Sequence, residues 1–394
     1  MSRNVPKLRF KGFEDEWKDN IIGNVCLINT GKRDTKNKVK NGKYPFFVRS
    51  NTVERINTYS FDGEAILTAG DGVGVGKVFH YVNCKFDYHQ RVYKLSNFNK
   101  INGKFLYEIF SNNFKKEVAK YNAKTSVDSV RLEMISKMKI KIPSLQEQEK
   151  IVNFLSKVDS IIEKQEKKVQ YWNSYKKGMM QKIFSQKIRF KDENGRDYPE
   201  WEEEKLGGIG QTYTGLSGKT KDDFGFGNGK YITYVNIFKN TKVDINMFDL
   251  VDIKKDEKQN KVLKGDILFT ASSETPNEVG MASVCDNNIE NLYLNSFCFG
   301  FRLNSKKDID YIFIGYLLRS PSLRKKISIL AQGSTRYNLS KSELMKIKIQ
   351  IPCLEEQRKI VNFLSNIDNL IEKESKKLEE LKQWKKGLLQ QMFV

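Results

Sequence analysis

The feature that most constrains the fold of this chain is a long segment that occurs twice. Residues 139–184 match residues 348–393 at a constant shift of 209 positions, without a gap. Inside this match, the seven residues 150–156 (KIVNFLS) are identical to residues 359–365. A repeat of this kind indicates that the chain contains two copies of one structural unit.

Both copies of the repeated segment are predicted to form one long helix. Their apolar residues recur at steps that mostly alternate between four and three, which is a heptad seam and requires a partner helix. Polar residues interrupt both seams at the same places, Gln165 and Lys176 in one copy and Glu374 and Lys385 in the other. Because polar residues at such positions fix register and partner choice, we expect each helix to pack against the other. The residues expected to hold this pair together are Ile151, Leu155, Val158 and Ile162 in the first copy and Ile360, Leu364, Ile367 and Ile371 in the second.

The starts of the two helices carry different signals. Each helix follows a proline, and Ser144 with Glu147 predicts a capping box in the first copy. Cys353 replaces the serine in the second copy, which predicts a weaker cap. From Gln146 to Phe184 a helix would extend for about 58 Å, since each residue adds about 1.5 Å.

The repeat continues into the segments outside the helices. Leu8-Arg9-Phe10 and Trp17 near the N-terminus are matched by Ile188-Arg189-Phe190 and Trp201 after the first helix. The chain is therefore expected to run as globular unit, helix, globular unit, helix. The expected bounds of these parts are 1–143, 144–185, 186–352 and 353–394.

Each globular unit is predicted to be mostly β-structure followed by helix. Short apolar runs separated by Gly, Asn and Asp predict the strands. These runs are residues 44–49, 64–68, 78–82 and 90–95 in the first unit and 231–235, 266–270, 282–285 and 296–303 in the second. Helical segments follow at 104–120 and 310–330, and this order of elements predicts an α+β fold.

The charge of the chain favours a nucleic-acid partner. The formal net charge is +21 at pH 7, which points first to nucleic acid and second to an anionic membrane surface. No run of residues approaches the ~20 apolar residues that span a bilayer, and the N-terminal segment lacks the apolar region of a signal peptide. The five cysteines form no CxxC pair and are odd in number, which is typical of reduced thiols in a cytoplasmic protein.

The motifs of catalysis are missing or incomplete. Residues 70–77 (GDGVGVGK) lack both the first glycine and the final Ser or Thr of a phosphate-binding loop. Residues 224–229 (FGFGNG) depart from the pattern of methyltransferases that bind S-adenosylmethionine, and a loop is expected there instead. His80 and His89 are the only histidines, and neither has a second ligand at metal spacing, so no zinc site is predicted. We therefore expect a binding protein without an active site, metal or cofactor of its own.

Polar residues on predicted loops are the candidates for contact with DNA. A basic chain holds phosphates without reading sequence, whereas polar side chains that reach base edges supply specificity. The candidates are Arg49, Asn51, Lys124 and Thr125 in the first unit and Asn236, Ser273, Asn277, Ser334, Thr335 and Arg336 in the second. Any one of them could equally be an ordinary solvated loop residue, so the prediction rests on the set.

The repeated segments resemble a known family. Residues 140–159 (IKIPSLQEQEKIVNFLSKVD) and 349–368 (IQIPCLEEQRKIVNFLSNID) are similar to the I-P-x-P-P-L-x-E-Q-x-x-I-x-x-x-L-x-x-x-D pattern of specificity (S) subunits of type I restriction–modification enzymes. Both copies lack two prolines of that pattern, at Lys141 and Gln350 and again at Ser144 and Cys353. The resemblance covers essentially the whole chain.

The resemblance implies an architecture and a set of partners. Each globular unit would be a target recognition domain that reads one half of a split, asymmetric site on double-stranded DNA. The two helices would pack antiparallel, as a coiled-coil spacer between the half-sites. Two modification (M) subunits would dock and bring S-adenosylmethionine for adenine methylation, and restriction (R) subunits would bring ATP and Mg for cleavage. The chain itself would be non-catalytic and cytoplasmic.

Two interpretations from other classes remain open at this stage. One is a coiled-coil scaffold that binds DNA without sequence preference, so that salt would abolish its affinity. The other is a self-contained DNA methyltransferase or nuclease, which the missing motifs disfavour.

Overall fold

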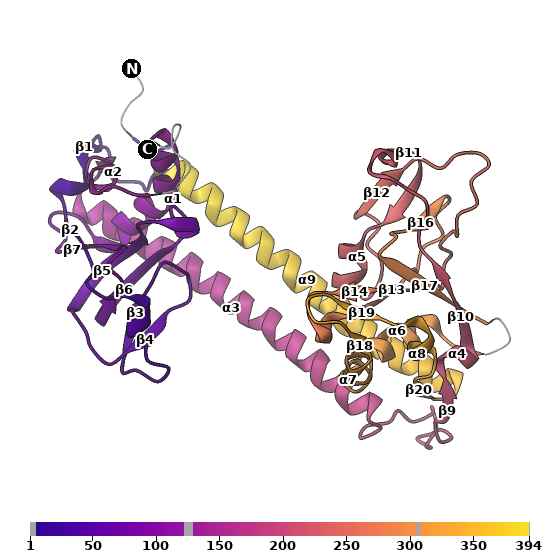
Figure 1. The fold of residues 1–394 in the computed structure, drawn as a ribbon. Helices are drawn as coiled ribbons and strands as arrows, with labels where there is room; N and C mark the ends of the chain where they lie inside the picture. The colour runs from indigo at the N-terminus through magenta and orange to yellow at the C-terminus, as the bar shows by residue number, and fades with distance from the viewer. Residues whose placement is uncertain (1–4, 122–128, 305–307, 394) are drawn as a thin grey trace. The chain divides into compact units, whose positions relative to one another are not determined.

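The computed structural model of this protein describes residues 5–121, 129–304 and 308–393. The chain divides into two units, of which the first is discontinuous in sequence (residues 1–166 with 376–394) and the second is continuous (residues 167–375). Two long helices, α3 (Leu145–Phe184) and α9 (Leu354–Met392), contribute one part to each unit. The long helices predicted from the repeat are thereby confirmed (Figure 1).

The first unit is built on one sheet of six strands in the order β2-β7-β5-β6-β3-β4. The strands are β2 (Leu27–Thr30), β3 (Tyr44–Phe47), β4 (Glu54–Ile56), β5 (Phe61–Ala69), β6 (Phe79–Tyr88) and β7 (Val92–Ser96). Side chains alternate between the two faces of a strand. On β5, Ile66 therefore packs with the helix α1 (Gly103–Tyr121), while Ala65 and Leu67 join a separate cluster around Phe86 on the other face.

The second unit carries its β-structure in smaller sheets. A four-stranded sheet has the order β10-β17-β13-β15, and two three-stranded sheets have the orders β12-β11-β16 and β14-β19-β18. The strands are β10 (Gly210–Thr214), β11 (Phe224–Ile232), β12 (Phe248–Val251), β13 (Ile267–Thr270), β14 (Ser272–Ser273), β15 (Ala282–Val284), β16 (Leu292–Leu294), β17 (Cys298–Leu303), β18 (Ala331–Gln332) and β19 (Tyr337–Leu339). Residues 224–229, expected as a loop, belong to β11. The two units thus share a fold class but differ in the number and strand order of their central sheets.

Two elements of the second unit, one helix and one strand, differ from the sequence prediction. The helix expected over 310–330 is divided into α6 (Tyr311–Arg319) and α7 (Pro321–Ile329), because the hydroxyl of Ser320 accepts a hydrogen bond from the backbone N–H of Leu323 and starts a new helix. The strand expected over 231–235 ends at Ile232. A short helix, α5 (Tyr234–Lys239), follows it.

A small strand pair closes each unit in the same way. In the first unit β1 (Lys18–Ile21) pairs antiparallel with β8 (Lys139–Ile142), and in the second β9 (Glu202–Lys205) pairs antiparallel with β20 (Lys348–Ile351). A short helix precedes each closing strand, α2 (Leu132–Ser136) before β8 and α8 (Lys341–Met345) before β20. The opening residues of each unit are therefore tied to the strand that leads into its long helix.

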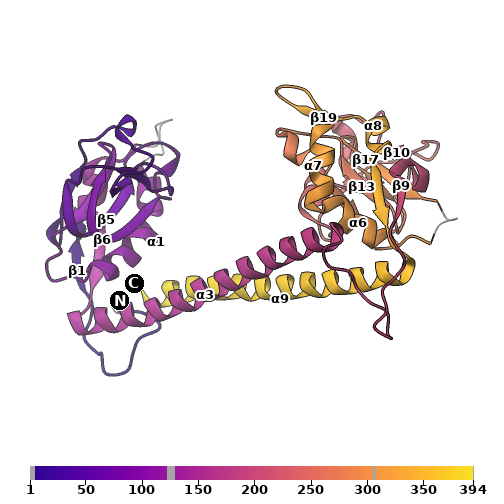
Figure 2. The same cartoon turned by 90° about the horizontal axis from the view of Figure 1, so that it is seen from below.

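Segments of α3 and α9 pack side by side inside each unit. In the first unit, Leu155 of α3 is buried in one cluster with Leu388 and Met392 of α9. In the second, Leu364 of α9 is buried in one cluster with Ile183 of α3. Figure 2 shows segments of α3 and α9 side by side. Because the start of one helix meets the end of the other, the packed segments run antiparallel.

The seam residues also belong to the cores of the globular parts. Leu155 shares its cluster with Trp17 and Phe105, and Leu364 shares its cluster with Phe313. The residues Ile151, Leu155 and Val158 are buried in the first unit, and Ile360, Leu364 and Ile367 are buried in the second. Ile162 and Ile371 are half-buried against the same clusters. The two sets therefore hold a globular part as well as the neighbouring helix.

The two lysines that interrupt the seam, Lys176 and Lys385, form ion pairs between the helices. Lys385 Nζ lies 2.7 Å from Asp159 Oδ1 in the first unit, and Lys176 Nζ lies 2.5 Å from Asp368 Oδ1 in the second. Each pair joins a lysine of one copy to the aspartate of the other copy, at matching positions of the repeat. The register of each packed pair is thus set by charge as well as by apolar contact.

Candidate nucleic-acid interface

A buried glutamate near the start of each long helix holds the opening segment of its unit. In the first unit, Arg9 donates from Nε and Nη2 to the two carboxylate oxygens of Glu147, both at 2.8 Å. The indole N–H of Trp17 donates to the same carboxylate at 3.4 Å. The predicted capping box is therefore half correct, since the hydroxyl of Ser144 accepts from the backbone N–H of Glu147 (3.3 Å) while the carboxylate binds Arg9 and Trp17.

The second unit repeats this arrangement with the matching residues. Arg189 donates from Nη2 to Glu356 Oε2 at 2.8 Å and from Nε to Oε1 at 3.3 Å. Trp201 donates from its indole N–H to Oε2 at 3.0 Å. Charge-assisted, two-pronged pairs of this kind are among the stronger hydrogen bonds in proteins. The repeated Arg and Trp of the opening segments thus have a structural role.

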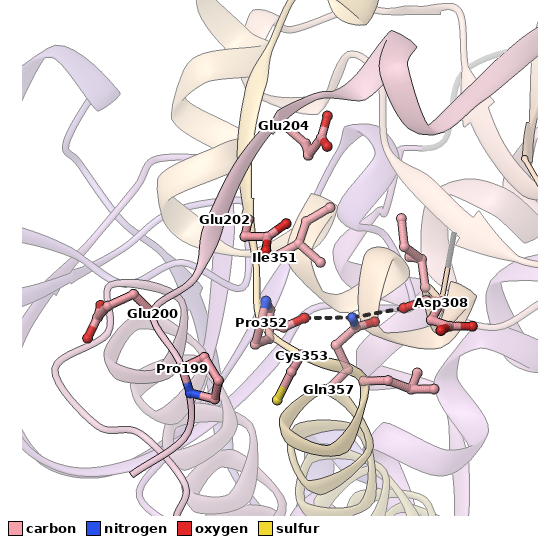
Figure 3. Close-up of a pocket in the computed structure, with 11 residues that line it drawn as sticks. Pro199, Glu200, Glu202, Glu204, Asp308, Ile351, Pro352, Cys353 and Gln357 are labelled. Carbon is pink, nitrogen blue, oxygen red and sulfur yellow. Dashed lines mark hydrogen bonds between the residues drawn. The ribbon is translucent and has the colours of Figure 1, made fainter. Parts of the chain in front are cut away.

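The glutamine that follows each of these glutamates links two helix starts. The Gln357 amide donates to the carbonyl of Pro352 at 2.8 Å and to that of Asp308 at 3.4 Å, as the dashed lines of Figure 3 show. Its own carbonyl accepts from the backbone N–H of Asp310, the residue that caps α6. Gln148 makes the equivalent bonds to the carbonyl of Pro143 and from the N–H of Asn102.

The cavity beside this glutamine is acidic. It has a volume of about 410 Å³ and is bounded by the side chains of Glu200, Glu202, Glu204 and Asp308 (Figure 3). Clustered carboxylates repel phosphate, so this cavity does not suit the DNA backbone. In the described ranges, no group of three or more His, Cys, Asp or Glu residues is arranged to hold a metal ion.

In the first unit, a carboxylate holds the main candidate for DNA contact. Arg49 donates to Asp71 Oδ1 at 2.8 Å, and Arg91 donates to Oδ2 of the same aspartate at 2.7 Å. Burial raises the pKa of Asp71, but the two arginines outweigh it and hold that pKa below its usual value. Both arginines remain about half exposed, and Asn51 is exposed beside them. Two cations share one anion here, which leaves a net positive surface.

Two first-unit candidates, Lys124 and Thr125, lie outside the described residues. The described chain resumes at Ser129, which forms an antiparallel bridge with Asp71. The adjoining Val130 donates its backbone N–H to the carbonyl of Gly70 at 2.8 Å. The segment that follows residues 122–128 is thus attached to the turn that carries Asp71.

In the second unit, the structure brings two of the predicted loops together. The strand β14 pairs antiparallel with β19, in the register Ser272↔Asn338 and Ser273↔Tyr337. The loop 332–336 therefore lies beside residues 272–277. Ser334, Thr335, Arg336 and Asn277 are exposed there, while Ser273 is buried.

Asn236 differs from the other candidates because it is fully buried. Its amide donates to the carbonyls of Asp244 (2.8 Å) and Met247 (3.2 Å), and its side-chain oxygen accepts from the N–H of Asp244 (2.9 Å). Its polar atoms are used to fix the segment after α5. This residue supports the fold, and we no longer count it among the DNA-contact candidates.

A cavity of about 460 Å³ opens between these loops and α5. Its lining includes Tyr234, Phe238, Glu278, Thr335 and Arg336. We call it the second-unit groove. The rings of Tyr234 and Phe238 are stacked with their centroids 6.0 Å apart. The groove thus combines flat apolar faces with charged side chains.

Arginines behind the second-unit groove hold its walls through backbone carbonyls. Arg324 donates to the carbonyls of Gly280 (2.7 Å) and Asn277 (2.9 Å), and Arg319 donates to that of Ile237 (2.8 Å) and to three further carbonyls. Burial lowers the pKa of each of these arginines to about 10. Their positive charge therefore serves the fold, so net charge alone does not identify the DNA contacts.

Comparison with known families decides the identity of this architecture. The model of the type I restriction–modification DNA specificity domain matches residues 14–170 and again 198–383. The chain belongs to the type I restriction–modification specificity family. A specificity subunit is the DNA-recognition component of such a system and not a catalytic one, and it works with M and R subunits.

Individual relatives agree with this assignment. The chain is 30% identical to the MjaVIII specificity subunit of Methanocaldococcus jannaschii, over 95% of this chain and 91% of the relative. It is 31% identical to the putative MjaX specificity subunit of the same organism, over 74% of this chain and 68% of that one.

A solved structure shares the fold of this specificity subunit. The type I S subunit from M. genitalium superposes with a TM-score of 0.58 at 16% identity, over 99% of both chains. A chain from a structure on type I complex assembly superposes with a TM-score of 0.54 at 18% identity, over 96% of this chain and 98% of that one. The predicted fold class is confirmed.

Sequence reasoning missed several residues that shape the candidate surface of this specificity subunit. Phe297 is 57% exposed with its ring against Arg336, and Phe238 lines the second-unit groove. Aromatic residues in a sequence are ordinarily assigned to the core, so nothing marked these two as surface residues. For Arg91, the missing information was the pairing of β5 with β7, which brings it to Asp71.

Proposed function

We propose that each unit of this specificity subunit reads one half of a split DNA site, and that the two halves differ in sequence. The observation that supports this proposal is that the two units share the same contacts at their ends, which we call the frame, but differ in their central sheets. Both units have the Arg–Glu–Trp arrangement and the closing strand pair, whereas one sheet of six strands in the first unit contrasts with three smaller sheets in the second. Equivalent frames place both units on DNA in the same way, and unlike middles recognise unlike bases.

The long helices would set the distance between the half-sites. Each is continuous, with 40 residues in α3 and 39 in α9. A helix of this length extends for about 60 Å, which exceeds the ~34 Å of one turn of DNA. The reciprocal ion pairs and buried seams favour a fixed register over a sliding one. A fixed register would impose a fixed number of base pairs between the two halves.

The partners follow from the repeat. A chain with two copies of one frame offers two equivalent docking surfaces, so two identical M subunits would bind. These would supply S-adenosylmethionine and the adenine methylation, and R subunits would supply ATP- and Mg-dependent cleavage. This DNA-directed role is expected in the cytoplasm. In the described ranges, no helix is long and apolar enough to cross a bilayer.

The DNA-contact residues of this proposal are the sequence candidates other than Asn236, with Arg91 added. In the first unit they are Arg49, Asn51 and the neighbouring Arg91, together with Lys124 and Thr125 from the sequence prediction. In the second they are the exposed Asn277, Ser334, Thr335 and Arg336, together with the buried Ser273; Ser273, Thr335 and Arg336 line the second-unit groove.

Methylation by the purified chain, alone and with its matching M subunit, tests the function. DNA with adenosylmethionine should be methylated only when both proteins are present. Binding by the pair should show a sequence preference that persists as salt is raised, even as total affinity falls. Methylation by the chain alone would contradict the proposal, as would binding by the pair whose affinity is lost in salt without any sequence preference.

A further inference from the structure

The loop 332–336 ends in an arginine that is anchored on one side only. Arg336 Nε donates to the hydroxyl of Ser272 at 3.1 Å, and its guanidinium carbon lies 5.4 Å from the centroid of the Phe297 ring. Within the described ranges, no hydrogen bond or ion pair engages Nη1 or Nη2 of this arginine. One edge of the guanidinium is thus held in place, and the other edge is left with its donors unused.

The other arginines near the candidate surfaces differ from Arg336, because their guanidinium groups are already engaged. Arg49 and Arg91 are paired with Asp71, and Arg319 and Arg324 are bonded to backbone carbonyls. An arginine stacked on a ring and fixed through Nε loses little further side-chain freedom when it binds. The two terminal nitrogens of Arg336 form a fork that matches a pair of acceptors lying side by side.

The surroundings of Arg336 distinguish a base from a phosphate. Glu278 lines the same groove, and its Oε2 accepts from the hydroxyl of Thr275 at 2.8 Å. Glu274 lines the groove as well and is exposed. Two carboxylates beside the fork oppose the approach of a phosphate. They can instead accept hydrogen bonds from the exocyclic amino groups of bases, as carboxylates do with cytosine.

We propose that Arg336 reads a guanine in the major groove of the half-site bound by the second unit, by donating from Nη1 and Nη2 to O6 and N7. This inference rests on the proposed function and adds the identity of one base and the residue that selects it. Guanine is the base whose major-groove edge presents two adjacent acceptors. The exposed ring of Phe297 supports the guanidinium from its flat side, and Glu274 and Glu278 disfavour the backbone as an alternative target.

The test uses the complex of the chain with its M subunit and a pool of duplexes. Two pools are used, each with one half-site held fixed and the other randomised. The methylated duplexes of each pool are sequenced. With the unmodified chain, one half-site should contain a position at which guanine is strongly favoured. Arg336→Gln should reduce that preference about 5- to 150-fold, which corresponds to the ~1–3 kcal/mol of a bidentate base contact. Every other position should keep its preference.

A matched control removes the same charge elsewhere in the second unit. Arg196 is an exposed loop residue, and Arg196→Gln should leave both half-sites unchanged. Arg336→Lys keeps the charge but replaces the planar fork by a single ammonium, so it should retain part of the guanine preference. If Arg336→Gln proves unfolded by its thermal transition, Arg336→Met, which is also neutral, decides.

The outcomes separate this inference from the proposed function. An intact guanine preference in the neutral variant that folds, Arg336→Gln or Arg336→Met, overturns the inference, and so does a uniform loss across all positions, because a phosphate contact weakens every sequence alike. Both results leave a split motif for the unmodified chain. If the unmodified chain yields no split motif, the proposed function itself fails.

Discussion

At the scale of single residues, the two buried glutamates explain why the same short motifs recur in both halves of the sequence. The side chain of Glu356 is fully buried, and it accepts from Arg189 and Trp201. Removing one partner of a buried, hydrogen-bonded charge pair leaves the other partner uncompensated. The motif E-Q could be read from the sequence, but its partners could not, because Arg189 lies 167 residues away.

Substitution of this glutamate should unfold the second unit at lower denaturant. Glu356→Gln keeps the shape but removes the charge, and we expect it to cost about 2–4 kcal/mol. Glu200→Gln is the matched control, because Glu200 also pairs with Arg189 but is 90% exposed, and it should cost less than about 0.5 kcal/mol. Chemical denaturation monitored by tryptophan fluorescence measures both. Equal costs for the two variants would refute a structural role for the buried pair.

A buried lysine makes the stability of the first unit depend on pH. Lys94 is 5% exposed, with its Nζ 3.4 Å from the centroid of the Phe61 ring, and burial lowers its pKa from 10.5 to about 8. Between pH 8 and 10.5 the unfolded chain binds more protons at this lysine than the folded chain, so stability should rise with pH over that window. Below pH 8 the cost of burying the charge is present in full.

Replacing this lysine tests the pH dependence. Lys94→Met should raise stability by about 1–3 kcal/mol at pH 7 and flatten the rise above pH 8. Thermal unfolding at a series of pH values measures both effects. Lys85→Met, on an exposed strand position, should keep the rise seen in the unmodified protein. A loss of stability in Lys94→Met at pH 7 would show that the cation–π contact outweighs the desolvation.

At the scale of elements, periodicity in the sequence predicted the long helices correctly, but it missed a helix break that depends on one or two residues. The heptad seam predicted α3 and α9 because apolar residues repeat over many turns. The break between α6 and α7 depends on Ser320 and Pro321 alone, within a run that is otherwise helical. The seam also predicted a partner helix, but not that Leu155 and Leu364 are buried against the globular parts as well.

The ion pairs between the helices should differ in strength although they are repeats of each other. Asp368 also accepts a hydrogen bond from the hydroxyl of Tyr316 at 2.6 Å, whereas Asp159 is 47% exposed. We expect Asp368→Asn to cost about 1–3 kcal/mol and Asp159→Asn to cost about 0–1 kcal/mol. Denaturation of the two variants side by side measures the difference. A larger cost at Asp159 would contradict this account of the register.

At the scale of the whole molecule, the sequence repeat predicted two similar units but not how their middles differ. The shift of 209 positions aligns the long helices and the strands β8 and β20 that precede them. It says nothing of the pairing that gives six strands in one sheet of the first unit and separate sheets in the second. Proposed base contacts such as Arg49, Asn51 and Asn277 lie in these unlike regions, which is why the predicted site residues were a loose set.

The central claim is that one chain reads two different half-sites at a fixed separation. Sequencing of the methylated adenines in DNA from cells that express this chain with its matching M subunit tests it most directly. The account predicts one split motif, with a few fixed bases, a constant gap, a different set of fixed bases and a methyladenine in each half. A contiguous motif, or no methylation by an M subunit that is active beside another specificity chain, would contradict it.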